Sequence, residues 1–354
     1  MTRFLIVRLG ALGDIVHAIP VAAALRRAFP ASRIDWLVSS RHREILDLVP
    51  AIDRRLAIAD WGNGSGASLL SAVRELRAAH YDAALDLQGL IKSALIARSS
   101  GAARVIGFAS RYLREPLARL FYSEVHDPGG AGIYAPSETR HVVDINLGLL
   151  ARLDVPAAPP EFSLDAPSSP AARLVLEQSG GRYALLNPCA AWSNKRWPAA
   201  KLAALARALK ERQGLASVIL WGRGERQLAE TVVRGAAGAA IIAPETTIVD
   251  VVALARGAAV MVSGDTGPAH IGAAVGTPLV GIYGPTRPER NGPWLAEDET
   301  VSRASMCQCH HLRECRRGRM CLEEIEVDEV LAAVERRLHG AAAQIRPAEA
   351  EQGA

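Results

Sequence analysis

The chain has 354 residues, of which 49% are apolar and 22% charged, and its formal net charge is +4. This length predicts about two domains, and the composition is typical of a water-soluble globular protein. The small net charge gives no reason to expect a nucleic-acid partner, and no run approaches the roughly twenty apolar residues that span a bilayer. We expect a cytoplasmic protein without a secretory signal, because a predicted strand follows Met-Thr-Arg directly.

Strand-like and amphipathic helical segments alternate along the chain, which predicts an α/β fold with mostly parallel sheets. In the first half the predicted strands are 4–8, 33–38, 83–87 and 104–108, and the predicted helices are 15–28, 41–48, 68–79 and 88–98. A segment rich in proline and glycine, 157–181, interrupts this pattern and is interpreted as the interdomain connection, with one strand and one helix attached. In the second half the predicted strands are 183–187, 216–221, 239–243, 258–262 and 278–283, and the predicted helices are 198–212, 227–236, 248–255, a helix from 268 onward and 327–338.

This pattern divides the chain into two similar halves and a C-terminal extension. The predicted parts are a first α/β domain over 1–160, a second over 161–326, a C-terminal helix over 327–339 and a flexible tail over 340–354. Two such halves facing each other favour a ligand in the cleft between them.

The sequence VSGDTGPAH joins one predicted strand of the second half to a helix that begins at Pro268. The N–H groups around Thr266 and Gly267, together with the positive end of the helix dipole, would form a phosphate site at the carboxyl end of a sheet. Asp265 and His270 add polar groups within one turn. The alternative is an ordinary strand-to-helix turn with an aspartate cap.

The first strand-to-helix loop has the pattern G-x-x-G-D, formed by Gly10, Gly13 and Asp14. It differs from the G-x-G-x-x-G pattern of dinucleotide-binding proteins, so a nicotinamide cofactor is not indicated. Asp14 lies in the first turn of the following helix, where the dipole favours the ionised carboxylate that a general base requires. The alternative is that Asp14 only caps the helix.

Two further loops follow strands of the second half. The first contains Lys195 and Arg196, adjacent cations that could neutralise a diphosphate, or could be solvated charges in an exposed loop beside a packed Trp197. The second contains Glu225, which could accept hydrogen bonds from ribose hydroxyls or could cap a helix. A third turn, 284–286, follows another strand. Because these loops all follow strands of one half, we favour a shared ligand site over a set of separate caps.

Four cysteines lie within fifteen residues, beside His310 and His311; they are Cys307, Cys309, Cys315 and Cys321. Thiols spaced C-x-C-x5-C-x5-C could bind a structural zinc or form disulfides. The spacing lacks the usual pair of C-x2-C motifs, and a cytoplasmic location disfavours stable disulfides. We expect free thiols in a small loop subdomain, with a zinc site as the alternative.

The motifs DTGPAH at 265–270, KRWP at 195–198 and G-x-x-G-D at 10–14 resemble the signature of the lipopolysaccharide heptosyltransferases, glycosyltransferase family nine. The resemblance runs from residue 3 to about residue 338. Within that family, the segments 86–93 and 114–118 look most like heptosyltransferase I. Heptosyltransferase II, or a member with another acceptor, stays open.

The resemblance implies a GT-B fold, in which two Rossmann-like domains face a central cleft. The N-terminal domain would bind the acceptor and the C-terminal domain the nucleotide sugar. The implied reaction is an inverting, metal-independent transfer, with no cofactor, from ADP-L-glycero-D-manno-heptose to a Kdo residue on lipid A. We expect a monomer that acts as a peripheral protein at the inner face of the inner membrane.

In this resemblance Asp14 would be the base that deprotonates the acceptor hydroxyl. The donor would be bound by residues of the second half: Lys195, Glu225, Asp265, Thr266, Gly267 and His270. Lys195 would hold the diphosphate, Glu225 the ribose, and Asp265 the sugar or phosphate region. A departing ADP gains negative charge, which N–H donors, a helix dipole and a cation can stabilise without magnesium.

The acceptor would be bound by residues of the first half: Gly13, Gln88, Lys92 and Arg114. The stretch 60–66 lacks the run of basic residues that heptosyltransferase I places near there, and Cys189 stands where the family often has glycine. The cysteine-rich segment is found in only part of the family. Two other classes stay open: a nucleotide-sugar epimerase on the same fold, and a non-catalytic nucleotide-sugar-binding protein, against which the presence of Asp14 argues.

Overall fold

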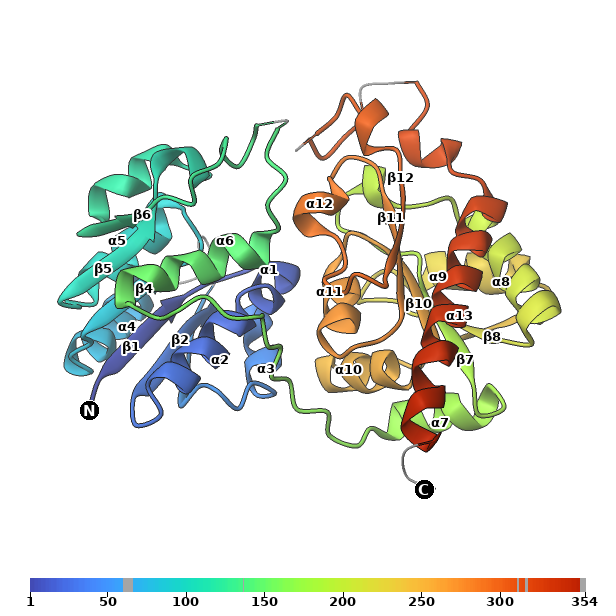
Figure 1. The fold of residues 1–354 in the computed structure, drawn as a ribbon, viewed down its shortest axis with the longest axis horizontal. Coiled ribbons are helices and arrows are strands. Elements are labelled where there is room, and N and C mark those ends of the chain that lie inside the picture. The colour runs from blue at the N-terminus through green and yellow to red at the C-terminus, as the bar shows by residue number, and fades with distance from the viewer. Residues whose placement is uncertain (60–65, 136, 311, 316–317, 351–354) are drawn as a thin grey trace. The chain divides into compact units, whose positions relative to one another are not determined.

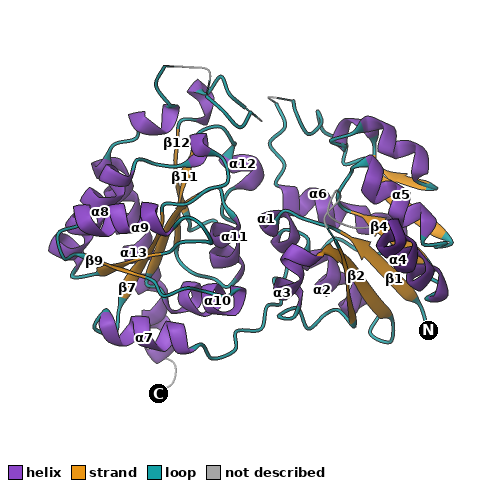
Figure 2. Ribbon diagram, turned by 180° about the vertical axis from the view of Figure 1, so that it is seen from behind, coloured by secondary structure: helices purple, strands orange, loops and turns teal. Residues whose placement is uncertain are grey.

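A computed structural model describes the chain over residues 1–59, 66–135, 137–310, 312–315 and 318–350 (Figure 1). By its internal contacts the chain divides into two compact units, Met1–Asp165 and Ala166–Ala354. Each unit contains a six-stranded sheet whose pairings are all parallel, with helices packed on it (Figure 2). The predicted α/β class with parallel sheets is therefore confirmed.

The sheet of the first unit has the strand order β3-β2-β1-β4-β5-β6. Its strands are β1 (Arg3–Val7), β2 (Arg33–Ser39), β3 (Arg54–Ile58), β4 (Ala83–Asp86), β5 (Arg104–Phe108) and β6 (Glu124–His126). Its α-helices are α1 (Leu12–Val16), α2 (Ile19–Ala28), α3 (Arg43–Leu46), α4 (Gly66–Ala78), α5 (Ile91–Ser99) and α6 (Val142–Gly148), and its short 3-10 turns are η1 (Ser40–His42), η2 (Ser110–Tyr112), η3 (Pro116–Phe121) and η4 (Leu149–Leu153).

The sheet of the second unit has the order β12-β11-β10-β7-β8-β9. Its strands are β7 (Tyr183–Asn187), β8 (Ala216–Ile219), β9 (Ala240–Ile242), β10 (Val260–Gly264), β11 (Leu279–Tyr283) and β12 (Glu299–Ser302). Its α-helices are α7 (Pro170–Gln178), α8 (Ala199–Gln213), α9 (Arg226–Gly235), α10 (Ile248–Gly257), α11 (Gly267–Ala274), α12 (Pro288–Asn291) and α13 (Val327–Ala350), and its 3-10 turns are η5 (Ser193–Lys195), η6 (Ala304–Met306) and η7 (Cys321–Glu324).

Both sheets have the doubly wound order in which the first and fourth strands of the unit are neighbours. At this pair the direction of the crossovers reverses, and ligands of open α/β sheets bind in the crevice beyond the carboxyl ends of these strands. The two switch points lie between β1 and β4 and between β7 and β10. Buried apolar runs such as Phe4–Val7 build the central strands, because both faces of a parallel sheet are covered by helices.

Several predicted elements differ from the structure. The helix predicted over 15–28 is divided into α1 and α2, because Pro20 lies in the first turn of α2 and cannot continue the hydrogen bonding of α1. The helix predicted over 41–48 is a 3-10 turn followed by the four-residue α3. The strand predicted within 157–181 does not form among the described residues 156–169, where prolines remove backbone donors.

The last helix, α13, continues to Ala350, beyond the predicted end at Leu338. The alanine-rich sequence after Gly340 favours this continuation. Among the described helices, none is both long enough and apolar enough to cross a bilayer.

Candidate active site

The switch point of the second unit is organised by polar side chains at the ends of β7 and β10. Asn187, the last residue of β7, donates through Nδ2 to Ser263 Oγ at 3.1 Å and to Thr266 Oγ1 at 3.0 Å. Its Oδ1 accepts the backbone N–H of Cys189 at 3.1 Å. One amide side chain therefore fixes the loops that follow both strands.

Asp265 is a buried carboxylate directly after β10. Its Oδ2 lies 2.6 Å from Nζ of Lys195, and its Oδ1 lies 2.9 Å from Nε2 of His270. Because a carboxylate only accepts, Nε2 carries the proton in this contact. Burial opposes the charged form, but the hydrogen bond from His270 and the charge of Lys195 outweigh it and hold the pKa of Asp265 far below its ordinary value. Asp265 therefore stays ionised at neutral pH.

Lys195 is the last residue of the turn η5, and its Nζ lies 4.6 Å from the centroid of the Trp192 ring. The loop approaches β10 closely: a Cβ added to Gly264 would lie 2.8 Å from the carbonyl oxygen of Lys195. A residue without a side chain is required at this point of contact. The backbone of the loop and its ammonium group are thus both fixed against the end of β10.

Helix α11 begins beside Asp265, with Thr266 as its N-cap, Gly267 as its first residue and Pro268 in its first turn. The Thr266 hydroxyl makes no capping bond to the helix; it bonds to Asn187 and lies 3.1 Å from Ser263 Oγ. The first-turn N–H groups have no partner within the helix, and they favour an anion. The alternative interpretation, an ordinary turn with Asp265 as a helix cap, is not what the structure shows, since the carboxylate oxygens of Asp265 bond to Lys195 and His270.

Glu225 is the N-cap of α9, but its side chain makes no capping bond. Its Oε1 lies 3.4 Å from Nη2 of Arg196, whose Nε donates to Ala190 O at 2.8 Å. The adjacent cations Lys195 and Arg196 therefore pair with different acids. Burial, with a contribution from Glu225, raises the pKa of the Cys189 thiol to about 12.

Asp14 lies in α1, at the carboxyl end of β1 in the first unit. Its Oδ2 accepts the N–H of Ala11 at 3.2 Å and forms an ion pair with Nη2 of Arg8 at 2.7 Å. The side chain is nevertheless 41% exposed, so a ligand can reach it. Asp14 thus does take part in capping α1, and the two interpretations of this residue are compatible. Arg8 was missed by sequence reasoning; the signal was a cation directly after a buried strand, beside the G-x-x-G-D loop.

Gln88 shapes the same loop from the end of β4. Its Oε1 accepts the N–H of Leu9 at 2.9 Å and of Gly10 at 3.3 Å. The neighbouring Asp86 is fully buried and accepts from Tyr122 OH at 2.8 Å. Burial raises the pKa of Asp86, although the bonds from Tyr122 and other donors oppose that shift. Gly13 lies within α1, where its carbonyl accepts the N–H of His17 at 3.0 Å.

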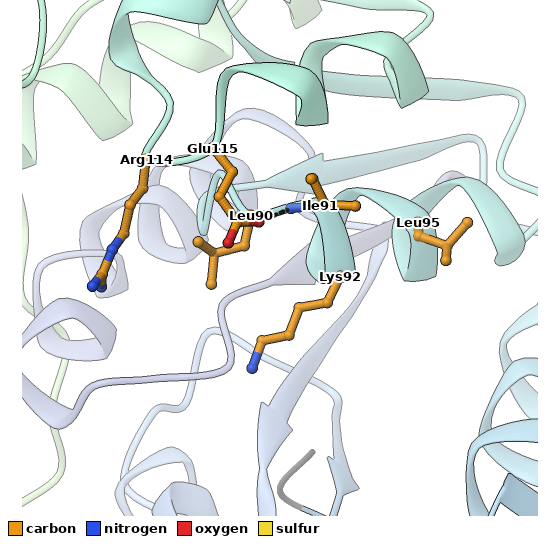
Figure 3. Close-up of a pocket in the computed structure, with 6 residues that line it drawn as sticks. All are labelled: Leu90, Ile91, Lys92, Leu95, Arg114 and Glu115. Carbon is orange, nitrogen blue, oxygen red and sulfur yellow. Dashed lines mark hydrogen bonds between the residues drawn. The ribbon is translucent and has the colours of Figure 1, made fainter. Parts of the chain in front are cut away.

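Lys92 and Arg114 line one open pocket of the first unit (Figure 3). The pocket has a volume of about 520 Å³, and its wall is completed by Leu90, Ile91, Leu95 and Glu115. Oε2 of Glu115 accepts the N–H of Ile91 at 2.7 Å, which fixes the start of α5 against the loop that carries Arg114. The stretch 60–65, where the sequence lacks the expected basic run, lies outside the described residues.

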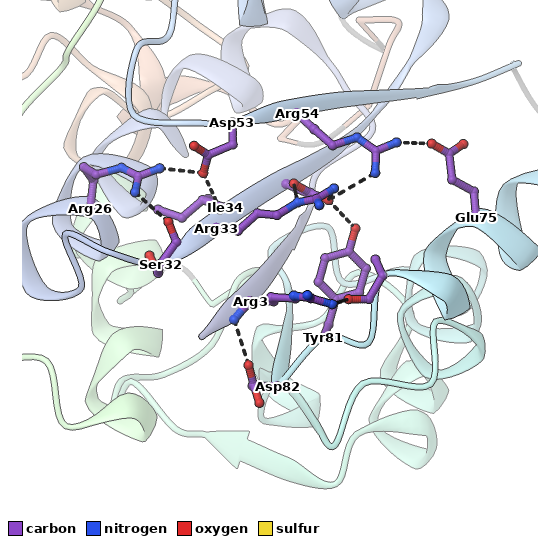
Figure 4. A network of polar contacts seen from close by, with 12 residues as sticks. Arg3, Arg26, Ser32, Arg33, Ile34, Asp53, Arg54, Glu75, Tyr81 and Asp82 are labelled. Atoms are coloured by element: carbon purple, nitrogen blue, oxygen red, sulfur yellow. Dashed lines mark hydrogen bonds and ion pairs between the residues drawn. The ribbon is translucent and has the colours of Figure 1, made fainter. Parts of the chain in front are cut away.

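A second buried charged network lies at the amino ends of the strands of the first unit (Figure 4). Asp35 of β2 accepts from Tyr81 OH at 2.7 Å and from Arg33 Nε at 2.9 Å. Burial and the bond to Asp35 raise the pKa of Tyr81 well above its ordinary value. Because ligand sites of parallel sheets lie at carboxyl ends, this network is assigned to stability.

The cysteine-rich segment forms a small cluster of its own. Cys307, Cys309 and Cys321 are buried together with Cys315 packed on them, and Cys309 Sγ lies 3.3 Å from Cys315 Sγ. Within the described residues no group of His, Cys, Asp or Glu side chains is arranged to hold a metal ion. The alternative of a zinc site here gains no support from these residues, and His311 lies outside them.

This cluster is connected to the loops of the switch point. Asn194, next to Lys195, donates through Nδ2 to the carbonyl of Leu312 at 3.0 Å, and Nδ1 of His310 lies 3.1 Å from Pro285 O. Burial, with a contribution from Cys307, raises the pKa of Cys321 to about 12. The segment therefore contacts both the loop that carries Lys195 and the 284–286 turn.

The fold and these loops define a glycosyltransferase. Residues 69–320 match the family described as glycosyltransferase family 9 (heptosyltransferase), and the chain belongs to that family.

Similar proteins share most of the chain's length. Lipopolysaccharide heptosyltransferase 1 of Pseudomonas aeruginosa is 30% identical over 300 residues, which cover 82% of this chain and 81% of that protein. The protein of the same name from Escherichia coli K12 is 28% identical over 310 residues, 85% of this chain and 93% of that one. Among solved structures, the E. coli heptosyltransferase WaaC with ADP has a TM-score of 0.74 at 25% identity, covering 95% of this chain and all of that chain.

Proposed function

We propose that the protein transfers a heptose from ADP-L-glycero-D-manno-heptose to a Kdo residue on lipid A, with inversion and without a metal ion. The observation that carries this proposal is the buried cluster of Lys195, Asp265 and His270 beside the start of α11. The relatives named as lipopolysaccharide heptosyltransferases support the sugar and acceptor class, and the ADP in the WaaC structure supports the nucleotide.

The donor diphosphate would lie at the N-terminus of α11. The backbone N–H groups of Thr266 and Gly267 would bind phosphate oxygens, and the Lys195 ammonium would neutralise the charge that grows on the departing ADP. Asp265 and His270 would hold Lys195 in place before the donor arrives. Glu225 would accept hydrogen bonds from the ribose hydroxyls.

The acceptor would be activated by Asp14. Its carboxylate takes the proton of the acceptor hydroxyl as that oxygen attacks the anomeric carbon of the heptose. The bond between this carbon and the phosphate oxygen breaks, and ADP departs with the electron pair. A single displacement of this kind inverts the anomeric centre. Arg8 keeps the Asp14 side chain in one orientation through their 2.7 Å contact.

The acidic acceptor would bind to the first unit. Lys92 and Arg114 supply two cations in one pocket, which suits the carboxylate of a Kdo sugar. Gln88 would act through the loop before α1, since it accepts two backbone N–H groups of that loop. Gly13, which precedes Asp14 in α1, would act through the backbone of that helix. The enzyme would work as a monomer at the cytoplasmic face of the inner membrane, where a lipid-linked acceptor is accessible.

The proposal is tested by incubating the protein with ADP-heptose and a panel of Kdo-bearing and heptose-bearing acceptors, read by mass spectrometry. Addition of one heptose to a Kdo acceptor, unchanged in EDTA, is the expected result. Addition only to heptose-bearing acceptors would reassign the acceptor within the family. An altered sugar formed with no acceptor present would favour an epimerase, and ADP-heptose binding without turnover on any acceptor would favour a non-catalytic binding protein.

A further inference from the structure

One surface of the first unit is both apolar and cationic. We define the α5–η3 surface by six exposed residues of these two elements: Ile91, Leu95, Arg98, Leu117, Arg119 and Leu120. It includes four of the large apolar side chains that the unit leaves in contact with water. Grouped exposed apolar residues on a water-soluble unit mark an interaction surface.

Helix α5 turns apolar residues toward solvent. Ile91, Leu95 and Arg98 follow one another at helical spacing on its exposed side, and the two apolar residues are 37% and 44% exposed. The opposite side of the helix, which includes Ile96 and Ala97, is buried. The helix thus packs on the unit through one face and still presents large aliphatic groups on the other.

The turn η3 adds the most exposed leucines. Leu117 and Leu120 are 64% and 77% exposed, whereas Ala118 between them is buried. The two elements pack against each other, and they are joined by the 2.7 Å bond between Ile91 N and Glu115 Oε2. The apolar groups of α5 and η3 are therefore held on one part of the unit.

The charges of this region are almost all positive. Across residues 91–120 the sequence contains one acid, Glu115, whose carboxylate already accepts from the start of α5. Arg98 and Arg119 form no ion pair within the described part of the chain, and neither do Lys92 and Arg114 in the adjoining pocket. Unpaired cations around exposed leucines complement an anionic lipid surface, where aliphatic groups enter the headgroup region and arginines meet phosphates.

We propose that the α5–η3 surface docks the protein on an anionic lipid bilayer. This inference rests on the proposed function, because it gives the lipid-linked acceptor a route to the site. Ile91 and Leu95 belong both to this surface and to the wall of the pocket that contains Lys92 and Arg114 (Figure 3). The acceptor's sugar would enter the pocket while its acyl chains stay in the bilayer.

The test is co-sedimentation with vesicles of phosphatidylglycerol and phosphatidylethanolamine, compared with vesicles of phosphatidylcholine alone. The wild type is expected to bind the anionic vesicles and to dissociate as salt is raised. Leu117→Ser with Leu120→Ser is expected to reduce binding by about tenfold or more, because the inserted apolar groups are lost. Arg98→Gln with Arg119→Gln is expected to weaken binding to the anionic vesicles about fivefold for each cation removed. The matched control is Leu174→Ser with Leu176→Ser, two exposed leucines of α7 in the second unit.

A second readout separates this inference from the proposed function. The leucine variant should transfer heptose to an acyl-free Kdo acceptor as well as the wild type, and fail only on acceptor embedded in vesicles. If neither protein transfers heptose to any acceptor, the proposed function is wrong. The vesicle-binding assay still tests whether the α5–η3 surface docks on lipid. Equal vesicle binding by wild type and leucine variant would overturn the inference. The inference would also be overturned if the wild type does not bind vesicles but sediments as a dimer, and the leucine substitutions dissociate that dimer.

Discussion

Nζ of Lys195 lies 2.6 Å from Oδ2 of Asp265, in a pair whose side chains are only 15% and 5% exposed. The contact joins the loop after β7 to the loop after β10, two segments seventy residues apart. A buried pair of this kind contributes little net stability as a whole, but removing one partner leaves an uncompensated charge. Lys195 is thus held in one orientation, and the N–H groups of its ammonium that do not face Asp265 fit the proposed contact with a diphosphate.

Lys195→Met tests this relationship. We expect a loss of about 3 kcal/mol in the free energy of unfolding, because Asp265 is left buried and charged. We also expect at least about a tenfold loss of ADP affinity, since the cation is removed and the freed carboxylate repels phosphate. Urea denaturation and calorimetric titration measure the two effects. Lys210→Met, an exposed lysine of α8, is the control.

Adding Asp265→Asn to the Lys195→Met variant should restore part of the lost stability, because the unpaired charge is then gone. ADP affinity should stay low, since no cation returns. If the double variant loses as much unfolding free energy as the two single substitutions lose together, the two groups are not coupled. The assignment of Asp265 as the partner that orients Lys195 would then be wrong.

The pH dependence of stability should depend on His270. The pKa of Asp265 is lowered in the folded protein, so its contribution is fully present above the unfolded pKa of about 3.9 and is lost only as pH falls through the lower folded value. In His270→Asn the folded pKa of Asp265 rises toward the unfolded value, so the contribution at neutral pH is smaller and its loss on acidification ends at a higher pH. The difference in unfolding free energy between wild type and variant should therefore be largest near neutral pH and should narrow between about pH 5 and pH 2. A difference that stays constant over this range would contradict the role given to His270.

The sequence places most of these residues correctly at strand ends, but it does not place them in space. Lys195, Asp265 and His270 could each be predicted in a segment that follows a buried strand, because the apolar runs before these segments are plain in the sequence. That β7 and β10 are neighbours follows from the strand order, which local patterns do not encode. The pairing of Lys195 with Asp265 was therefore not predicted; the resemblance assigns Lys195 to the diphosphate and Asp265 to the sugar or phosphate region.

The strands that were not predicted share a position in their sheets. β3, β6 and β12 lie at sheet edges, where a strand is short and covered on fewer sides. The sequence of β3, RRLAI, begins with two arginines and has only a short apolar run for a local pattern to detect. Arg8 was missed for a related reason: its partner Asp14 lies across a loop, so their contact depends on the path of the backbone between them.

Asp14→Asn should abolish transfer while leaving donor binding intact. We expect kcat to fall by about a thousandfold, because an amide cannot take the acceptor proton, whereas ADP affinity should match that of the wild type. Asp47→Asn is a suitable control: Asp47 is also a partly exposed acid of the first unit, 3.1 Å from Arg55. Transfer at the wild-type rate in Asp14→Asn would remove Asp14 as the base, and loss of ADP binding would mean that the substitution disturbs more than proton transfer.

Gly264→Ala should damage the donor site through packing alone. The added Cβ would lie 2.8 Å from the carbonyl oxygen of Lys195, and a backbone atom cannot swing away as a side chain can. The Lys195 loop must therefore move from β10, which should cost about 1–3 kcal/mol of unfolding free energy and weaken ADP binding. Gly318→Ala is the control, because a Cβ there meets no atom within 4 Å. If Gly264→Ala binds ADP as tightly as the control, the close approach of this loop to β10 is not needed to hold Lys195 in its binding position.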